Sequence, residues 1–145
     1  MAARSVPPDV WTGAIVLPGR TVVRGRGVQH PLPPGREPDF GLYLGVDFRP
    51  PWAHERLDWP DFGLPRDRLA AVRAIERLHR RARDSEHVEV ACRAGKGRTG
   101  TVIACLAVLD GLPPGHAVNW TRDHYHHRAV QTPWQRRWVL RFPRS

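Results

Sequence analysis

The sequence predicts an α/β fold with a central, mostly parallel sheet flanked by helices, in a single domain over residues 1–145. The chain has 145 residues, 41% of them hydrophobic, which is enough apolar material for one packed core. Residues 87–92 alternate and then become apolar, like a buried strand, and a glycine-rich turn and an apolar helix follow directly. This order places a helix N-terminus at the carboxyl edge of a sheet, which is a common anion site.

The first half of the chain predicts short strands joined by loops. Residues 13–24 indicate two apolar strands around a turn at Pro18 and Gly19. Residues 25–39 are rich in glycine and proline and indicate a loop, whereas residues 41–46 indicate a buried strand. An irregular, proline-containing stretch then ends in the segment WPDFGLP, residues 59–65.

The second half predicts helices around the strand at residues 87–92. Residues 67–83 are typical of an amphipathic helix, since apolar side chains recur every three or four positions between arginines: Leu69, Val72, Ile75, Leu78 and Ala82. Residues 101–111 predict a buried helix that ends at Gly111. Two more helices are expected near residues 115–125 and 133–142, with core faces that carry Trp120, Trp134 and Trp138.

The basic charge of the chain does not by itself indicate a nucleic-acid partner. The formal net charge is +9, and Lys96 is the one lysine among the 23 basic residues. The arginines are spread along the chain beside many Ala, Gly and Pro residues, which is typical of GC-rich coding. No run of basic residues is interleaved with aromatics to form a stacking surface, so we expect no nucleic-acid partner.

Cysteine usage and hydropathy exclude several other classes of protein. The two cysteines, Cys92 and Cys105, are too few for a disulfide framework and lack the paired spacing of a zinc site. No stretch reaches the roughly 18 apolar residues that a membrane helix requires, and the segment MAARSVPPDV does not resemble a signal peptide. We expect a cytoplasmic protein with no membrane span.

The segment CRAGKGRTG, residues 92–100, has the features of a phosphate-binding loop that carries a nucleophile. Glycines in the loop let backbone N–H groups turn inward, and the helix N-terminus that follows favours both a phosphate and a thiolate at Cys92. The planar fork of Arg98 can hold two phosphoryl oxygens, and the hydroxyl of Thr99 can donate to the sulfur. A core cysteine beside a turn is the structural alternative, and it does not explain these neighbours.

CRAGKGRTG resembles the active-site loop of the cysteine-dependent protein tyrosine phosphatase superfamily. The resemblance implies that Cys92 is the nucleophile, that Arg98 binds phosphate and that Thr99 supports the thiolate. The phosphate would lie in the loop formed by Arg93, Ala94, Gly95, Lys96, Gly97 and Arg98. Ala91 stands where this superfamily usually has histidine. A nucleotide-binding Walker loop fits less well. That motif has Gly-Lys-Ser/Thr in succession, whereas Lys96 is followed here by Gly97 and Arg98.

Two further segments resemble loops of the same superfamily, in the same order along the chain. WPDFGLP is similar to the mobile acid loop, which makes Asp61 the expected general acid; the alternative is a surface turn beside a core tryptophan. AVQTPWQRRWV is similar to the glutamine loop, which makes Gln131 the expected residue that positions water. Gln135 either contacts the phosphate site or caps the last helix with Thr132 in a T-x-x-Q box.

The resemblance to a small bacterial-type protein tyrosine phosphatase implies an enzyme that needs no cofactor. Its expected substrate is phosphotyrosine in proteins, with phosphoserine and phosphothreonine as further substrates, hydrolysed through a cysteinyl-phosphate intermediate. An enzyme acting on phosphoinositides or inositol polyphosphates is the first alternative, and a catalytically inactive phosphate- or RNA-binding module is the second. We expect no metal site, since His124, His126 and His127 lack a carboxylate or cysteine partner at ligand spacing.

Overall fold

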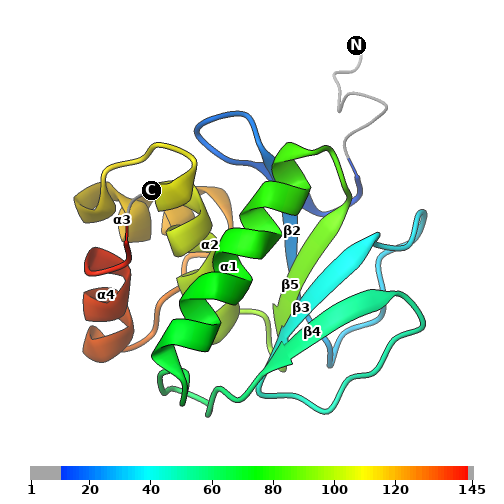
Figure 1. Ribbon diagram of the computed structural model, residues 1–145, viewed down its shortest axis with the longest axis horizontal. Coiled ribbons are helices and arrows are strands. Elements are labelled where there is room, and N and C mark those ends of the chain that lie inside the picture. Colours follow the sequence, from blue (N-terminus) through cyan, green and yellow to red (C-terminus); the bar gives the residue numbers. More distant parts are fainter. Residues whose placement is uncertain (1–10, 144–145) are drawn as a thin grey trace.

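The computed structural model describes residues 11–143 and confirms the predicted α/β fold, with helices packed beside a five-stranded sheet (Figure 1). The elements follow in the order β1 (Ala14–Val16), β2 (Val22–Gly27), β3 (Phe40–Leu44), β4 (Ala53–Leu57), α1 (Arg68–Arg83), β5 (Val88–Cys92), α2 (Gly97–Leu109), α3 (Pro114–His124) and α4 (Pro133–Leu140). Within these residues no helix combines the length and apolarity needed to cross a membrane.

The sheet brings the carboxyl ends of its central strands to one edge. Its strand order is β1-β2-β5-β3-β4, in which β2, β5, β3 and β4 are parallel and β1 is antiparallel to β2. In this register Gly27 lies beside Cys92, and Tyr43 lies beside Ala91. The loops after β2, β5 and β3 therefore meet around Cys92, as the carboxyl ends of parallel strands do.

Two strands differ from the prediction, because they contain polar residues, whereas a strand is recognised in a sequence by an apolar run. β2 continues to Gly27, into residues predicted as loop, since its arginines find buried partners inside the protein. β4 lies in the stretch predicted to be irregular; its sequence AHERL is mostly polar, and the strand forms the edge of the sheet. Edge strands pair on one side only and tolerate such polar residues.

The helices pack against one face of the sheet and enclose the core with it (Figure 1). α1 begins after Asp67, whose carboxylate accepts a hydrogen bond from Ala70 N, and it buries Ile75 and Leu78 against this face. α2 is buried along nearly its whole length, as predicted. Two apolar side chains expected in the core are instead exposed: Leu69 at 57% and Trp134 at 46%.

The opposite face of the sheet carries a buried cluster of charged and polar side chains. Glu89 lies at its centre and accepts hydrogen bonds from Arg24 at 2.7 Å, Arg26 at 2.9 Å and the Tyr43 hydroxyl at 2.6 Å. The ring of Trp11 lies over the Arg24 guanidinium at 3.7 Å, which shields the cluster from solvent. Every strand of the central trio contributes to this cluster, so it fixes how β2, β5 and β3 pair.

The cluster predicts a defined loss of stability when Glu89 is changed. Burial raises the pKa of Glu89, but hydrogen bonds from Arg26, Tyr43 and Arg24 outweigh it, so the folded pKa lies below the usual 4.5. Its stabilising contribution is then present above about pH 4.5 and is lost as pH falls through the lowered pKa. Glu89→Gln leaves two guanidinium groups without their carboxylate and should lower the free energy of unfolding by about 3 kcal/mol at pH 7.

Urea unfolding of the wild type and of Glu89→Gln at neutral pH and at several acidic values measures both effects. The wild type should lose stability more steeply than the variant as pH falls below about 4.5. Equal stability of the two proteins at pH 7 would contradict the role given to the cluster.

Candidate active site

The phosphate loop begins where β5 ends at Cys92 and closes where α2 begins at Gly97. Gly95 has a φ of +77°, a conformation that favours glycine, and its N–H donates to the sulfur of Cys92 at 3.3 Å. A Cβ on Gly95 would lie 2.4 Å from the backbone nitrogen of Gly27, and one on Gly27 would lie 2.5 Å from the carbonyl carbon of Ala94. The loop and the end of β2 therefore pack backbone against backbone.

Neighbouring segments hold the carbonyl groups of the phosphate loop. The backbone N–H groups of residues 28 and 29 donate to the carbonyls of Cys92 and Arg93 at 2.9 and 3.1 Å. The hydroxyl of Tyr125 donates to the carbonyl of Gly95. These bonds fix the loop through its carbonyls, as is suited to a backbone nest, in which N–H groups bind an anion.

Arg98 is 5% exposed, and groups at the sheet edge fix its orientation. Its Nη1 donates to the carbonyls of Leu44, at 3.2 Å, and Trp59, at 3.0 Å, while its Nε has no hydrogen-bond partner among the described residues. Gly45 permits this arrangement: its φ is +65°, and a Cβ there would lie 2.0 Å from the Trp59 carbonyl oxygen and 2.5 Å from Nη1. The guanidinium is thus held in place with donors still free for phosphate oxygens.

Thr99 lies beside Arg98 at the start of α2 and is fully buried. Its hydroxyl has no hydrogen-bond partner among the described residues, so the expected donation to the sulfur of Cys92 stays a prediction. A buried hydroxyl without a partner is uncommon, because the desolvation of the group is then uncompensated. The Thr99 hydroxyl is therefore available to donate a hydrogen bond to the thiolate or to a bound phosphate.

The acid loop lies at the carboxyl edge of the sheet, near the phosphate loop. Trp59 is fully buried, packs edge-on against Trp138 at 5.5 Å, and donates from its indole N–H to the Gly63 carbonyl at 2.8 Å. The side chain of Asp61 is 62% exposed, and its carboxylate lies 3.5 Å from Nη2 of Arg98. This separation places the carboxyl group of Asp61 next to the guanidinium of Arg98.

The two glutamines have different surroundings. Gln131 is exposed, and its side chain packs against Gly97 so closely that a Cβ there would lie 2.5 Å from Oε1. Gln135 is fully buried: its Oε1 accepts from Gln131 N at 2.9 Å, its Nε2 donates to Gly63 O at 3.1 Å, and its backbone N–H is capped by Thr132. Both ends of Gln135 are occupied by the protein, so this geometry offers a structural link in place of the expected phosphate contact.

Basic groups line the rim of the phosphate loop. Arg93 is exposed and Lys96 is half-buried. Burial lowers the pKa of His126, and the positive charges of His127, Lys96 and Arg128 lower it further. No cluster of metal-ligating side chains is present among residues 11–143.

Sequence reasoning missed Gly27, Gly45 and Tyr125, because their roles depend on contacts between distant segments. Tyr125 is the first residue after α3, and its ring lies close to Gly25 and Ile103 while its hydroxyl reaches Gly95 of the phosphate loop. Burial raises the pKa of Tyr125, and the nearby Cys92 raises it further, so the hydroxyl keeps its proton and remains a donor. Gly27 ends β2 and Gly45 follows β3, and these two glycines are the signal in the sequence that marks the close approaches.

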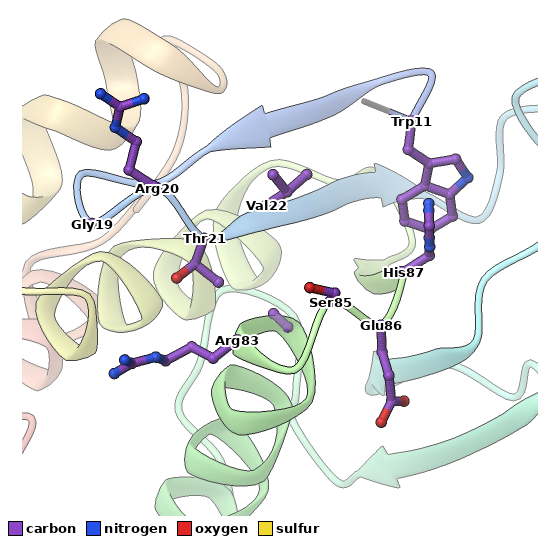
Figure 2. Close-up of a pocket in the computed structure, with 10 residues that line it drawn as sticks. Trp11, Gly19, Arg20, Thr21, Val22, Arg83, Ser85, Glu86 and His87 are labelled. Atoms are coloured by element: carbon purple, nitrogen blue, oxygen red, sulfur yellow. The ribbon is translucent and has the colours of Figure 1, made fainter. Parts of the chain in front are cut away.

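The cavity drawn in Figure 2 is separate from this site. It has a volume of about 500 Å³ and lies between the β1–β2 turn and the segment that leads into β5, where the rings of Trp11 and His87 meet edge-on at 5.3 Å. His87 precedes β5 whereas Cys92 ends it, so the cavity is at the opposite end of that strand. A groove of about 490 Å³ adjoins the acid loop and includes Gly45 and Asp58 in its lining.

Comparisons with known proteins agree with this geometry. Residues 54–140 match the family described as PTP-SAK, "Swiss Army Knife protein, DSP-PTPase phosphatase domain". The chain is similar to the crystal structure of Tk-PTP in its active form, with a TM-score of 0.66 and 22% identity over 90% of this chain and 95% of that one. It also resembles kinase associated phosphatase (KAP), with a TM-score of 0.56 and 20% identity over 68% and 65% of the chains. The crystal structure of PTPMT1 is also similar, with a TM-score of 0.55 and 16% identity over 72% of this chain and 74% of that one.

The packing at Gly45 predicts a catalytic defect from one added methyl group. In Gly45→Ala the Cβ collides with Trp59 O and Arg98 Nη1, which displaces the guanidinium from the carbonyls of Leu44 and Trp59 that hold it. Small displacements of a positioned group cost about 10²-fold in rate, so kcat/KM toward an aryl phosphate should fall by about that factor.

Gly35→Ala is the matched control, since Gly35 also has a positive φ, of +105°, but has open space around its Cβ position. Both variants strain the backbone, whereas only one disturbs Arg98. Steady-state rates and thermal unfolding of both variants separate the two effects, and equal activity in the two would show that Gly45 has no part in holding the arginine.

Proposed function

The chain belongs to the PTP-SAK family of DSP-PTPase domains and is a cysteine-dependent phosphatase; from this premise we propose that it hydrolyses phosphotyrosine in proteins, with phosphoserine and phosphothreonine as further substrates. The observation that carries the proposal is the guanidinium of Arg98, which the carbonyls of Leu44 and Trp59 fix at the N-terminus of the buried helix that follows the Cys92 loop. A phosphate monoester dianion matches this combination of donors in charge and shape. The cytoplasmic location expected from the sequence stays a prediction.

In the first step, the thiolate of Cys92 forms a bond to phosphorus as the bond from phosphorus to the leaving oxygen breaks. Arg98 and the N–H groups of the loop hold the equatorial oxygens, whose charge must be stabilised in the transition state. Asp61 transfers a proton to the leaving oxygen, a contribution typically of about 10² to 10⁴ in rate. Its carboxylate lies 3.5 Å from Arg98, so it is beside the group proposed to bind the phosphate.

In the second step, water attacks the cysteinyl phosphate. Gln131 lies at the rim beside Gly97 and orients the water, and the Asp61 carboxylate accepts its proton. The sulfur–phosphorus bond breaks, its electron pair returns to Cys92, and inorganic phosphate is released. The thiolate is then ready for another cycle.

The rim of the site supports an aromatic substrate. Phe62 is 55% exposed directly after Asp61, and Trp134 is exposed beside it, joined to Phe62 by a hydrogen bond of 2.6 Å. Large apolar side chains at a surface commonly mark a binding site when they gather beside polar groups. A phenyl ring on the leaving oxygen would contact these two aromatics.

A second candidate substrate is an inositol phosphate or phosphoinositide. Arg93 and Lys96 lie inside the loop segment, and Arg93 projects into solvent. A second phosphate on an inositol ring could contact them, whereas phosphotyrosine offers no such group. The neighbour PTPMT1 has been solved in complex with PI(5)P, which makes this class a specific alternative.

The covalent mechanism predicts that Cys92→Ser abolishes turnover of a phosphotyrosine peptide but retains the anion site, because the loop and Arg98 are unchanged. Vanadate should raise the thermal unfolding temperature of the wild type. Phosphate release and thermal unfolding measure the two properties. Full activity in Cys92→Ser would rule out the cysteine as nucleophile.

The two substrate classes are separated by changing Arg93 and Lys96 together to alanine. If the enzyme acts on phosphotyrosine, kcat/KM should fall by similar factors for a phosphotyrosine peptide and an inositol polyphosphate, since both lose only general positive potential. A loss at least tenfold greater for the inositol polyphosphate would favour the second candidate; such a loss corresponds to one charge-assisted contact.

A further inference from the structure

Trp134 makes a hydrogen bond that neither core packing nor contact with an aromatic substrate requires. It is the second residue of α4, it is 46% exposed, and its indole N–H donates to the carbonyl of Phe62 at 2.6 Å. Phenylalanine at this position could keep the ring contacts of the half-exposed side chain, but it could not make the hydrogen bond. The bonded carbonyl belongs to the residue after Asp61.

We propose that Trp134 is a positioning residue that latches the acid loop in its closed position, with Asp61 over the phosphate site. The proposal rests on the proposed function of Asp61 as general acid. It assigns to Trp134 no contact with the reacting atoms. Its effect on the reaction passes through the backbone of Phe62.

The backbone at Phe62 needs such an external contact. Phe62 has a φ of +59°, in the left-handed region that non-glycine residues rarely adopt without support. Its N–H donates to the Asp61 carboxylate at 3.0 Å, and the same carboxylate oxygen lies 3.5 Å from Arg98. The orientation of the Phe62 peptide units is therefore coupled directly to the position of the acid.

The helix that carries Trp134 is a firm support. Trp138 and Val139 anchor α4 in the core, and Gln135 donates to the Gly63 carbonyl at 3.1 Å. Two consecutive carbonyls of the acid loop, at residues 62 and 63, are thus bound by two consecutive side chains of α4. Of the two, Trp134 is on the surface and can be changed with little effect on packing.

Loss of one neutral hydrogen bond should shift the loop toward open states by a modest factor. We expect Trp134→Phe, which keeps an aromatic ring but lacks the N–H, to lower kcat about three- to tenfold for phenyl phosphate. A substrate with a strongly acidic leaving group, such as 2,4-dinitrophenyl phosphate, needs little protonation and should lose less than twofold. In an Asp61→Asn background the substitution should change neither rate.

Trp120→Phe provides a matched control. Trp120 is a half-buried tryptophan of α3, and the structure records no hydrogen bond from its indole within the described part of the chain. Its replacement should leave both rates unchanged. Equal losses for the two substrates in Trp134→Phe, or a loss that persists in the Asp61→Asn background, would overturn the latch.

Hydrogen exchange supplies a readout that does not depend on turnover. The amide of Gly63, which donates to the Pro60 carbonyl at 2.9 Å within the acid loop, should exchange several-fold faster in Trp134→Phe than in the wild type or in Trp120→Phe. Unchanged exchange would overturn the latch whatever the activity. Faster exchange in Trp134→Phe, together with a wild-type protein that turns over no phosphate monoester, would support the latch and contradict the proposed function.

Discussion

The pair of hydrogen bonds from Arg98 to the carbonyls of Leu44 and Trp59 is the constraint on which the rest of the site depends. Leu44 ends β3 and Trp59 begins the acid loop, so the guanidinium joins the sheet edge to the segment that carries Asp61. An arginine held by the protein before phosphate binds loses little conformational freedom on binding. The same two bonds thus fix the orientation of the guanidinium and connect it to the acid loop. They also require glycine at position 45, where a Cβ would collide with the Trp59 carbonyl and the guanidinium.

Support for the phosphate loop comes from several directions. The end of β2 packs against the loop backbone at Gly27. Tyr125, directly after α3, donates a hydrogen bond to the Gly95 carbonyl. On the far face of the sheet, Glu89 and its arginines lock the strands that end in the loop. Ala91 pairs in register with Tyr43 and Arg26 of this cluster, and its methyl group has no hydrogen bond to offer the loop. The surrounding packing, rather than a residue adjacent to Cys92, fixes the loop in this protein.

Sequence reasoning predicted the local features well and the long-range contacts poorly. The amphipathic pattern of α1, the apolar run of α2 and the glycine-rich loop are local signals, and each was predicted within a few residues of its place. β4 and the end of β2 were missed, because polar side chains interrupt the apolar pattern by which a strand is recognised in a sequence. Their ion-pair and hydrogen-bond partners include residues of other strands and helices, which the local sequence does not show. Trp134 and Leu69 have the spacing of core residues yet are exposed. Each lies in the first turn of its helix, and the periodicity of a helix does not show whether another element covers that turn. Gly45 contacts Trp59 and Arg98, 14 and 53 positions away, and Tyr125 contacts Gly95, 30 positions away, so no local pattern can reveal their roles.

The central claim is that Cys92 becomes phosphorylated during turnover, and rapid quenching tests it most directly. Wild-type enzyme mixed with ³²P-labelled phosphotyrosine peptide and quenched within milliseconds should carry label on the peptide that contains Cys92. The first turnover should also release a burst of dephosphorylated peptide equal to the labelled enzyme. Steady turnover with no label on that peptide and no burst, under conditions in which the intermediate would accumulate, would contradict the account.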